Sequence, residues 1–447
     1  MLNRSRRSSE PSVVNAPVAV GQPVRILLLS DSFLPHAGGS REYYNNMYRE
    51  LVALGRTEVL VLTKKVPGWK EFDQKPRNPR FQIRRRFKPL PSWKYQHLAK
   101  GIGPFVQALY AALSWRPDIV HAGDLYPQGM TAYLLKRVLG IPYIIYCHGE
   151  EITQTDRYRF QPRVRNRIYA NADAVIANAE FAKQELLRIG VEERRIHKVT
   201  PGVDSKRFGP NPAPQELVRQ YKLEGKTIVL TVARLVARKG HRASLKAFAT
   251  ICKEFPLAHY LIAGTGPEES RIRQLIEELG LQDRVTMMGF VPSDRLPDLY
   301  NLCDFMVLAN RQESDGDIEG FGIVFLEANA AGRPVIGGRS GGTPEAIRDG
   351  VTGYLVNPND HIEIAAAMRS LLSNPALRQS MGRAGRSFAT GQFDWTARAQ
   401  MLERIDVSLL RVDERLSFAS SLLSNTQQTV FEAGKRASSH PDTPVEY

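Results

Sequence analysis

The chain has 447 residues, which is enough for two domains with a full core each. Its 61 basic and 46 acidic residues give a formal charge of +15, which favours an anionic partner such as a nucleic acid, a membrane or a negatively charged substrate. Because no nucleic-acid recognition module is visible, we expect no nucleic-acid partner. The three cysteines lack the spacing of a metal site or a disulfide framework, which suits a reducing compartment.

Residues 1–23 are rich in serine, proline and arginine, and we expect them to form a disordered leader. No apolar run of signal-peptide length follows the basic start, and no stretch is long enough to span a bilayer. We therefore expect a cytoplasmic protein, one that can still attach peripherally to the inner face of the cell membrane.

Residues 24–208 alternate between short apolar runs and helical patterns. The runs have the length and composition of buried parallel strands, and they cover residues 24–30, 58–63, 118–122, 142–147 and 173–177. This alternation predicts a Rossmann-like domain built on a doubly wound parallel sheet.

Two features of this domain lie where ligands bind in such sheets, beyond the carboxyl ends of strands. Gly38 and Gly39 form a glycine loop between the first strand and a helical pattern, although the full GxGxxG pattern is missing. His148 directly follows the strand at residues 142–147. We expect both to contact a ligand, but a plain turn and a structural histidine explain them equally well.

The proline-rich residues 210–214 look like a linker, after which a second alternating pattern begins. Its predicted strands cover residues 227–233, 259–263, 284–288, 304–308 and 334–337. We therefore expect residues 209–392 to form a second Rossmann-like domain of α/β class, with a cleft between the two. Residues 393–412 include a further helical pattern, and the polar residues 413–447 are expected to be a mostly disordered tail.

One stretch of the second domain combines two carboxylates with a glycine-rich helix start. From Gly322 onward the sequence is apolar nearly all round, which predicts a buried helix, and Glu327 within it is costly to ionise unless something binds it. Glu319 lies eight residues earlier, about 12 Å along a helix axis. We therefore expect Glu319 just before the helix and Glu327 about two turns inside it.

The glycine-rich helix start between these glutamates presents free N–H groups and the positive end of the helix dipole, which suit an anion. Carboxylates, in turn, accept hydrogen bonds from hydroxyl groups. A ligand with hydroxyls at both ends and phosphates in the middle fits this layout, and a nucleoside diphosphate sugar is such a ligand. The alternative is an ordinary helix that carries two surface glutamates.

Two cations and two apolar residues in the second domain fit the same ligand. Arg234 and Lys239 follow the first strand of the domain, where fixed cations suit a diphosphate through charge-assisted hydrogen bonds of about 1.5–3 kcal/mol each. Arg238 lies between them in the sequence and could face solvent instead. Phe290 and Val291 follow another strand and could offer an apolar wall and backbone groups to a base.

The charged residues resemble the motif set of a known family. Glu319 and Glu327 match the E-x7-E motif of the retaining GT-B glycosyltransferases of family four. Arg234 and Lys239 match that family's phosphate-binding Arg and Lys at the same spacing, and Gly38-Gly39 is similar to its N-terminal glycine loop.

Two further segments extend the resemblance. Pro201-Gly202-Val203-Asp204 is similar to the family's segment near the hinge, and Phe393-Asp394-Trp395 to the start of the helix that crosses back to the first domain. The similarity covers about residues 24–412. It implies a GT-B fold, in which two Rossmann-like domains face a cleft, the first binding the acceptor and the second the donor.

The resemblance also implies a role for each matched residue. Glu319 would hold hydroxyls of the donor hexose, and Glu327 those of the ribose. Arg234 and Lys239 would neutralise the diphosphate as it leaves. His148 would lie at the sugar, near the reacting centre.

Backbone groups complete the implied donor site, from the glycine loop of the first domain and from Gly320, Phe321, Gly322 and Ile323. Family members work without a metal and retain the anomeric configuration by front-face attack, with the leaving phosphate accepting the acceptor's proton. Two cations and the helix dipole could supply the charge stabilisation of a metal. Asp315-Gly316-Asp317 resembles the metal site of a different class of sugar transferase, but no further ligands lie nearby, and we expect no metal and no other cofactor.

The run from Glu319 to Glu327 looks most like the phosphatidylinositol mannosyltransferase branch, and residues 315–320 also look like exopolysaccharide transferases. The implied function is transfer of a hexose, of mannose or glucose type, from a nucleotide diphosphate sugar to a lipid-linked or glycan acceptor. A nucleotide-sugar epimerase or hydrolase on the same fold and a non-catalytic nucleotide-sugar binder are the alternatives.

The segment from Lys64 to Lys100 holds twelve basic and two acidic residues, a local charge of 12 − 2 = +10, together with several aromatic residues. Basic and aromatic side chains together suit docking on an anionic membrane surface, at about 1 kcal/mol per basic residue. The alternative is a solvated basic face.

Overall fold

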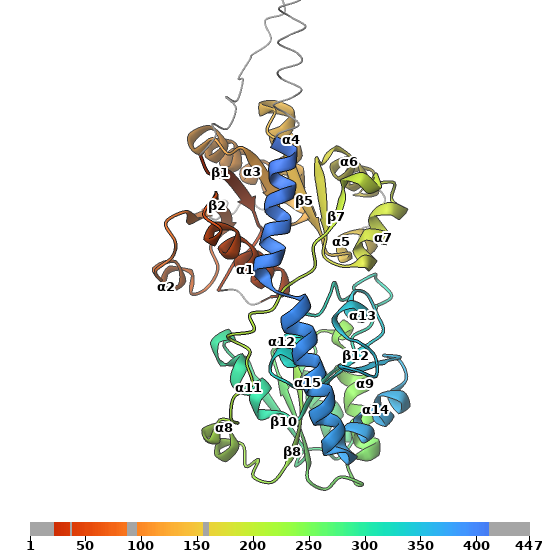
Figure 1. Ribbon diagram of the computed structural model, residues 1–447. Helices are drawn as coiled ribbons and strands as arrows, with labels where there is room; N and C mark the ends of the chain where they lie inside the picture. Colours follow the sequence, from red (N-terminus) through yellow and green to blue (C-terminus); the bar gives the residue numbers. More distant parts are fainter. Residues whose placement is uncertain (1–21, 36–37, 87–95, 155–160, 411–447) are drawn as a thin grey trace, which may run out of the picture.

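The protein consists of two domains stacked end to end, and the chain crosses between them twice (Figure 1). The computed structural model describes four ranges of the chain: residues 22–35, 38–86, 96–154 and 161–410. The predicted tail, and all but the last two residues of the predicted leader, lie outside the described residues.

The N-terminal domain is built on a seven-stranded parallel sheet with the order β3-β2-β1-β4-β5-β6-β7. Its strands are β1 (Val24–Leu29), β2 (Thr57–Lys64), β3 (Phe81–Arg86), β4 (Ile119–Ala122), β5 (Tyr143–Cys147), β6 (Ala174–Ala177) and β7 (Ile196–Lys198). Its helices are α1 (Gly39–Ala53), α2 (Trp69–Asp73), α3 (Gln96–Trp115), α4 (Met130–Leu139), α5 (Glu150–Thr153), α6 (Gln161–Asn171) and α7 (Glu180–Arg188).

The C-terminal domain has a six-stranded parallel sheet with the order β10-β9-β8-β11-β12-β13. Its strands are β8 (Thr227–Val232), β9 (Ala258–Ala263), β10 (Val285–Gly289), β11 (Phe305–Leu308), β12 (Val335–Gly338) and β13 (Gly353–Val356). Its helices are α8 (Gln215–Gln220), α9 (His241–Ile251), α10 (Glu269–Glu278), α11 (Leu296–Leu302), α12 (Ile323–Ala330), α13 (Thr343–Ala346), α14 (His361–Ser373) and α15 (Pro375–Gln392). The predicted fold class, two doubly wound parallel-sheet domains, is confirmed.

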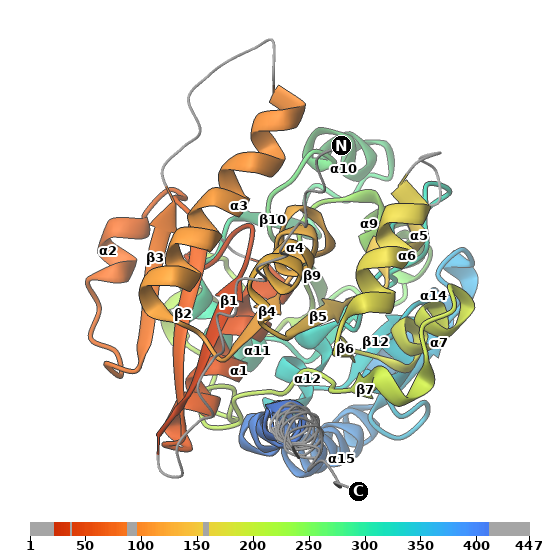
Figure 2. The same cartoon turned by 90° about the horizontal axis from the view of Figure 1, so that it is seen from above.

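Each sheet is covered on both faces because successive side chains of a strand point to opposite sides. In β1, Leu27 and Leu29 join one hydrophobic core with α3, α4 and α6, whereas Ile26 and Leu28 join another with α1. Figure 2, an end-on view, shows the helices of the N-terminal domain on the two sides of its sheet. None of the described helices is long and apolar enough to cross a membrane.

The second face of the N-terminal sheet is completed by the end of the chain. Residues 395–410 are helical and run back along the N-terminal domain (blue in Figure 1). Trp395, Ala399 and Leu402 lie on one side of this helix and are buried in the core beneath α1. Near its end, Asp406 lies 3.0 Å from Nε2 of His121 on β4, and both side chains are buried.

All ten predicted strands exist, each within one residue of its predicted bounds at either end. Three strands were not predicted: β3, β7 and β13. All three are edge strands, and they are short or, in β3, carry three consecutive arginines, so they lack the apolar run that marks a buried strand.

Candidate functional site

Helix α12 and the loop before it carry both glutamates of the predicted motif. The helix begins at Ile323, so Glu327 lies about one turn inside it rather than two, which corrects the prediction. The cause is local, because Gly322 adopts a φ of 91° and the chain from Glu319 to Gly322 is a loop. The helix itself is largely buried and apolar all round, as predicted.

Glu327 is mostly buried and accepts a hydrogen bond from a tyrosine of its own domain. The Tyr300 hydroxyl donates to its Oε2 at 2.7 Å. Burial raises the pKa of Glu327 to about 7, partly offset by this hydrogen bond, and the carboxylate of Glu42 on α1 of the other domain adds to the rise. A buried carboxylate that is costly to ionise is suited to accept hydrogen bonds from ligand hydroxyls.

Glu319 pairs directly with Lys239. The side chains of both residues are 12% exposed, and Nζ of Lys239 donates a hydrogen bond to Oε2 of Glu319. Burial opposes ionisation, but Lys239, Arg238 and Arg234 outweigh it, so the pKa of Glu319 is lowered and its carboxylate is charged at neutral pH. The residues predicted to bind the sugar and the phosphate, Glu319 and Lys239, are therefore in contact with each other.

A glycine allows this pairing. Lys239 ends the short turn Ala237–Lys239, which follows β8. The next residue, Gly240, has a φ of 69°, and a Cβ atom there would lie 1.9 Å from the carbonyl oxygen of Ala309. Glycine lets the turn approach the end of β11 closely, and this places Lys239 beside the loop that carries Glu319.

Arg238 points into the protein, so the alternative of a solvent-facing side chain is wrong. Its side chain is 13% exposed, and Nη1 lies 2.6 Å from Oδ1 of Asp317 and 3.4 Å from Oε2 of Glu150. Its Nε lies 4.0 Å from Oε2 of Glu319. Apart from the acidic residues near Glu319, no local pattern indicated this arrangement, because Glu150 belongs to the other domain.

Arg234 remains available at the same boundary. Its side chain is exposed and has no ion pair with any residue in the described part of the chain. It is close enough to Arg41 on α1 for its charge to lower the pKa of that guanidinium, to which burial contributes most. Arg41 occupies the space that a side chain on Gly38 would need, so the predicted glycine loop lies opposite Arg234.

His148 lies just beyond β5, as predicted, and faces the glutamate loop. Its Nε2 is 2.8 Å from the Tyr44 hydroxyl, and burial lowers the pKa of the imidazole to about 4, so the ring is neutral at pH 7. A Cβ atom on Gly320 would lie 2.8 Å from the carbonyl oxygen of His148. The absence of a side chain at Gly320 brings the two domains together at this point.

The glycine turn before α13 packs against the backbone of Glu319. Gly341 has a φ of 56°, and a Cβ atom there would lie 2.0 Å from the carbonyl oxygen of Glu319. The N–H group of Gly342 donates to the same oxygen at 3.1 Å. This turn therefore fixes the backbone of a predicted site residue.

Further contacts hold the loops of the two domains together. Thr153 Oγ1 donates to the carbonyl oxygen of Gly316 at 2.6 Å, and Gln154 Nε2 donates to Oδ1 of Asp317 at 2.9 Å. On the neighbouring helix α13, Glu345 lies 3.1 Å from Nζ of Lys198. Sequence reasoning missed these partners, since each pair joins residues more than a hundred positions apart.

The other predicted donor-site residues differ in how accessible they are. Phe290 follows β10 and its side chain is 61% exposed, whereas Val291 packs partly against the core. Phe321 is buried, with its ring 5.9 Å from that of Phe393, so it can offer a ligand only backbone groups. Gly39 is the first residue of α1. A ligand role for these residues stays a prediction.

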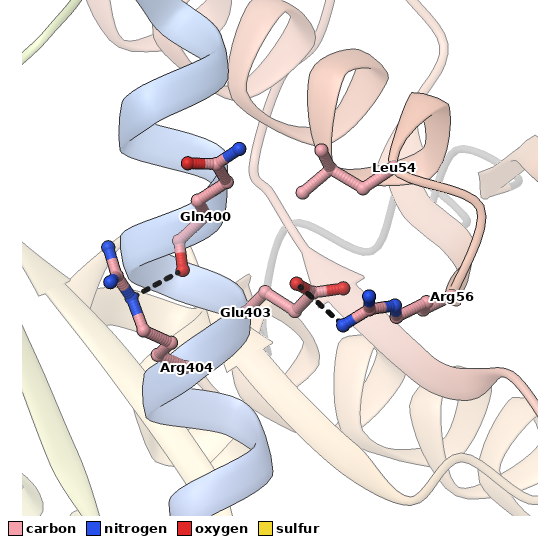
Figure 3. Close-up of a pocket in the computed structure, with 5 residues that line it drawn as sticks. All are labelled: Leu54, Arg56, Gln400, Glu403 and Arg404. Carbon is pink, nitrogen blue, oxygen red and sulfur yellow. Dashed lines mark hydrogen bonds and ion pairs between the residues drawn. The ribbon is translucent and has the colours of Figure 1, made fainter.

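No group of three or more potential metal ligands occurs among the described residues. In the Asp-Gly-Asp loop, Asp317 is engaged by Arg238. A hollow of about 330 Å³ lies elsewhere, at the amino end of β2, lined by Leu54, Arg56, Gln400, Glu403 and Arg404 (Figure 3). It contains none of the predicted site residues.

Family models match both halves of the chain. Residues 37–207 match the model described as Glycosyltransferase Family 4, and residues 215–388 match the model described as Glycosyl transferases group 1. Together the two models cover most of the described residues.

Curated relatives and solved structures agree with these matches. A GDP-mannose-dependent alpha-(1-6)-phosphatidylinositol monomannoside mannosyltransferase from Mycobacterium tuberculosis is 31% identical over 388 residues, which cover 85% of this chain and 97% of the relative. The relative of the same name from Mycolicibacterium smegmatis is 29% identical, again with 85% and 97% covered. Sucrose-phosphate synthase from Thermosynechococcus elongatus superposes with a TM-score of 0.74 at 26% identity, covering 87% of this chain and 100% of that structure.

HepE from Anabaena, solved in complex with UDP and glucose, superposes with a TM-score of 0.72 at 21% identity, covering 86% of this chain and all of that structure. At this identity the likeness supports the fold.

The raised pKa of Glu327 predicts that ionising this buried carboxylate costs stability. Ionising Glu327 is penalised only in the folded state, so the penalty is absent below about pH 4.5 and complete above pH 7. We expect Glu327→Gln to be more stable than the wild type by about 3 kcal/mol near pH 8, with the difference vanishing toward pH 4.5. Thermal unfolding of both proteins across this pH range measures it, and a difference independent of pH would contradict the assignment.

Proposed function

Because this chain belongs to family 4 of the GT-B glycosyltransferases and is a hexosyltransferase that uses a nucleotide sugar, we propose that its donor is GDP-mannose and its acceptor a lipid-linked or glycan hydroxyl. The observation that carries the donor site is the contact between Lys239 and Glu319. In a hexose linked to phosphate, the phosphate and the sugar hydroxyls are neighbours. A site for such a ligand therefore needs a cation next to a carboxylate. The names of the mycobacterial relatives favour mannose and guanine.

In the proposed complex, Lys239 turns from Glu319 to the diphosphate, and Arg234 joins it from the exposed side. Glu319 then accepts hydrogen bonds from the hexose, and Glu327 from the ribose. The start of α12 lies between the two carboxylates, with its free N–H groups and positive dipole end available to the phosphates.

We propose that the transfer retains the anomeric configuration. The bond from the anomeric carbon to the phosphate oxygen breaks as the acceptor hydroxyl attacks the same face, and its proton passes to the leaving phosphate. No carboxylate is then required as a nucleophile. His148 is neutral at pH 7 and can donate or accept a hydrogen bond at the sugar.

We further propose that no metal takes part, since the cations Arg234 and Lys239 and the α12 dipole can stabilise the leaving diphosphate. A competing activity is hydrolysis or epimerisation of the donor without an acceptor. It differs from transfer in a simple observable, because it consumes the nucleotide sugar without forming a glycosylated product.

An attachment to the membrane would bring a lipid acceptor to the enzyme. Between residues 102 and 115, α3 carries no charged side chain, and four apolar residues are exposed on it, Ile102, Val106, Tyr110 and Leu113. Figure 2 shows α3 (orange) on the outside of the N-terminal domain, beside β3. On β3, Arg84 is exposed. Residues 87–95 of the predicted basic segment lie outside the described residues. We propose that this face rests on an anionic membrane surface.

A ligand screen tests the donor proposal. We expect GDP-mannose, at about 100 times its dissociation constant, to stabilise the wild-type protein by about 2.7 kcal/mol, seen as a thermal shift. UDP-glucose and ADP-glucose serve as comparisons. Glu327→Ala and Lys239→Ala should not respond, because they remove the ribose and phosphate contacts. A wild-type protein that responds to no nucleotide sugar would contradict the donor site.

Flotation with liposomes tests the membrane proposal. At low salt we expect the protein to float with vesicles that contain an anionic lipid and not with neutral ones, and high salt should release it. Replacing Tyr110 and Leu113 together by serine should weaken flotation. A matched control is Leu257→Ser, which removes an equally exposed side chain of the other domain. Absence of flotation at low salt, or equal loss in the control, rules the proposal out.

A further inference from the structure

Arg238 occupies an unusual place beside the proposed donor site. Nη1 is satisfied by Asp317 and lies within ion-pair distance of Glu150. Its Nε, in contrast, is buried and has no hydrogen-bond partner among the described residues. Oε2 of Glu319 lies 4.0 Å from this Nε.

The same oxygen of Glu319 now accepts the hydrogen bond from Lys239. If Lys239 binds the donor's diphosphate, as proposed above, it must leave Glu319. A buried carboxylate that loses its cation is strongly penalised and tends to take up a proton. A protonated Glu319 would hold the hexose less well, because one of its oxygens would no longer accept hydrogen bonds from the sugar hydroxyls.

We propose that Arg238 is a positioning residue that takes over from Lys239 as the counter-ion of Glu319 when the donor binds. The unpartnered Nε–H needs a movement of about 1 Å to reach hydrogen-bond distance from Oε2. Asp317 and Glu150 anchor the far end of the guanidinium, so its fork stays oriented while the lysine moves. This inference rests on the proposed function, and it concerns the sugar rather than the nucleotide.

Arg238 also connects the sugar-side carboxylate to the other domain. Glu150 belongs to α5, directly after His148, and Arg238 belongs to the turn after β8. One guanidinium lies close to Glu150, Asp317 and Glu319. How firmly the Glu319 side chain is held in position therefore depends on the contact between the domains. The hexose would therefore be held firmly only when the two domains meet.

Other charged groups face Glu319 and must be separated from Arg238 in a test. Lys239 and Arg234 come from its own domain, and Glu150 comes from α5. Asp317 shares Arg238 with it. Glu327, assigned to the ribose, affects the nucleotide and the nucleotide sugar alike, so its titration cancels in a comparison of the two ligands.

The test compares calorimetric titrations of GDP and GDP-mannose into the wild type, Arg238→Gln, Arg238→Lys and Arg242→Gln. Arg242 is a matched control, an exposed arginine four residues further on with no ion pair in the described part of the chain. We expect Arg238→Gln to lose about tenfold in affinity for GDP-mannose, equivalent to about 1.4 kcal/mol, and to lose less in affinity for GDP, which also draws Lys239 away from Glu319 but has no hexose for that carboxylate to hold. Arg238→Lys should recover part of the loss, and Arg242→Gln should behave as the wild type.

The pH dependence gives an independent readout. Without Arg238 the pKa of Glu319 should rise, so the preference for GDP-mannose over GDP should disappear at a higher pH in Arg238→Gln than in the wild type. An unchanged preference at every pH overturns the inference, and so does an equal loss for both ligands, which would indicate a purely structural role. If Arg238→Gln does not fold, Arg238→Lys gives a smaller form of the same difference, in which the affinity for GDP-mannose falls by more than the affinity for GDP. A wild type that binds neither ligand overturns the proposed donor as well.

Discussion

The ion pair between Lys239 and Glu319 is the interaction on which the site depends. It sits at the boundary of two domains, largely shielded from water, and Arg238 and Asp317 surround it. Buried charges are costly unless they are paired and hydrogen-bonded. Removing one partner therefore leaves an unpaired buried charge that destabilises the folded protein. A ligand that supplies both an anion for the lysine and hydroxyls for the glutamate replaces the pair at little cost. The ion pair therefore provides groups complementary to a sugar phosphate, a cation for the phosphate and a carboxylate for the hydroxyls.

The fold creates this pattern from pieces that are distant in the chain. Parallel strands bring the turn after β8, the loop after β11 and the loop after β5 to one edge of their sheets. Gly240, Gly320 and Gly341 then allow backbones to approach to distances that a Cβ atom would prevent. The helix at residues 395–410 fixes the two domains to each other through the N-terminal core.

The interior strands and the charged motif could be predicted from the sequence, because both depend on local residue patterns. A run of apolar residues marks a buried strand, and the eight-residue spacing of Glu319 and Glu327 identifies the motif. The bend at Gly322 could not be predicted from the sequence. This bend places Glu327 one turn rather than two inside α12. Nor could Arg238 be identified as a partner of Glu150 or Tyr300 as a partner of Glu327, since those contacts exist only after the chain has folded.

A crystal structure of the protein with GDP-mannose bound would show whether the donor displaces Lys239 from Glu319. We expect Nζ of Lys239 to leave Glu319 and lie about 3 Å from a phosphate oxygen, while hexose hydroxyls take its place at the Glu319 carboxylate. A complex in which the Lys239–Glu319 pair stays intact and the sugar binds elsewhere would contradict this expectation.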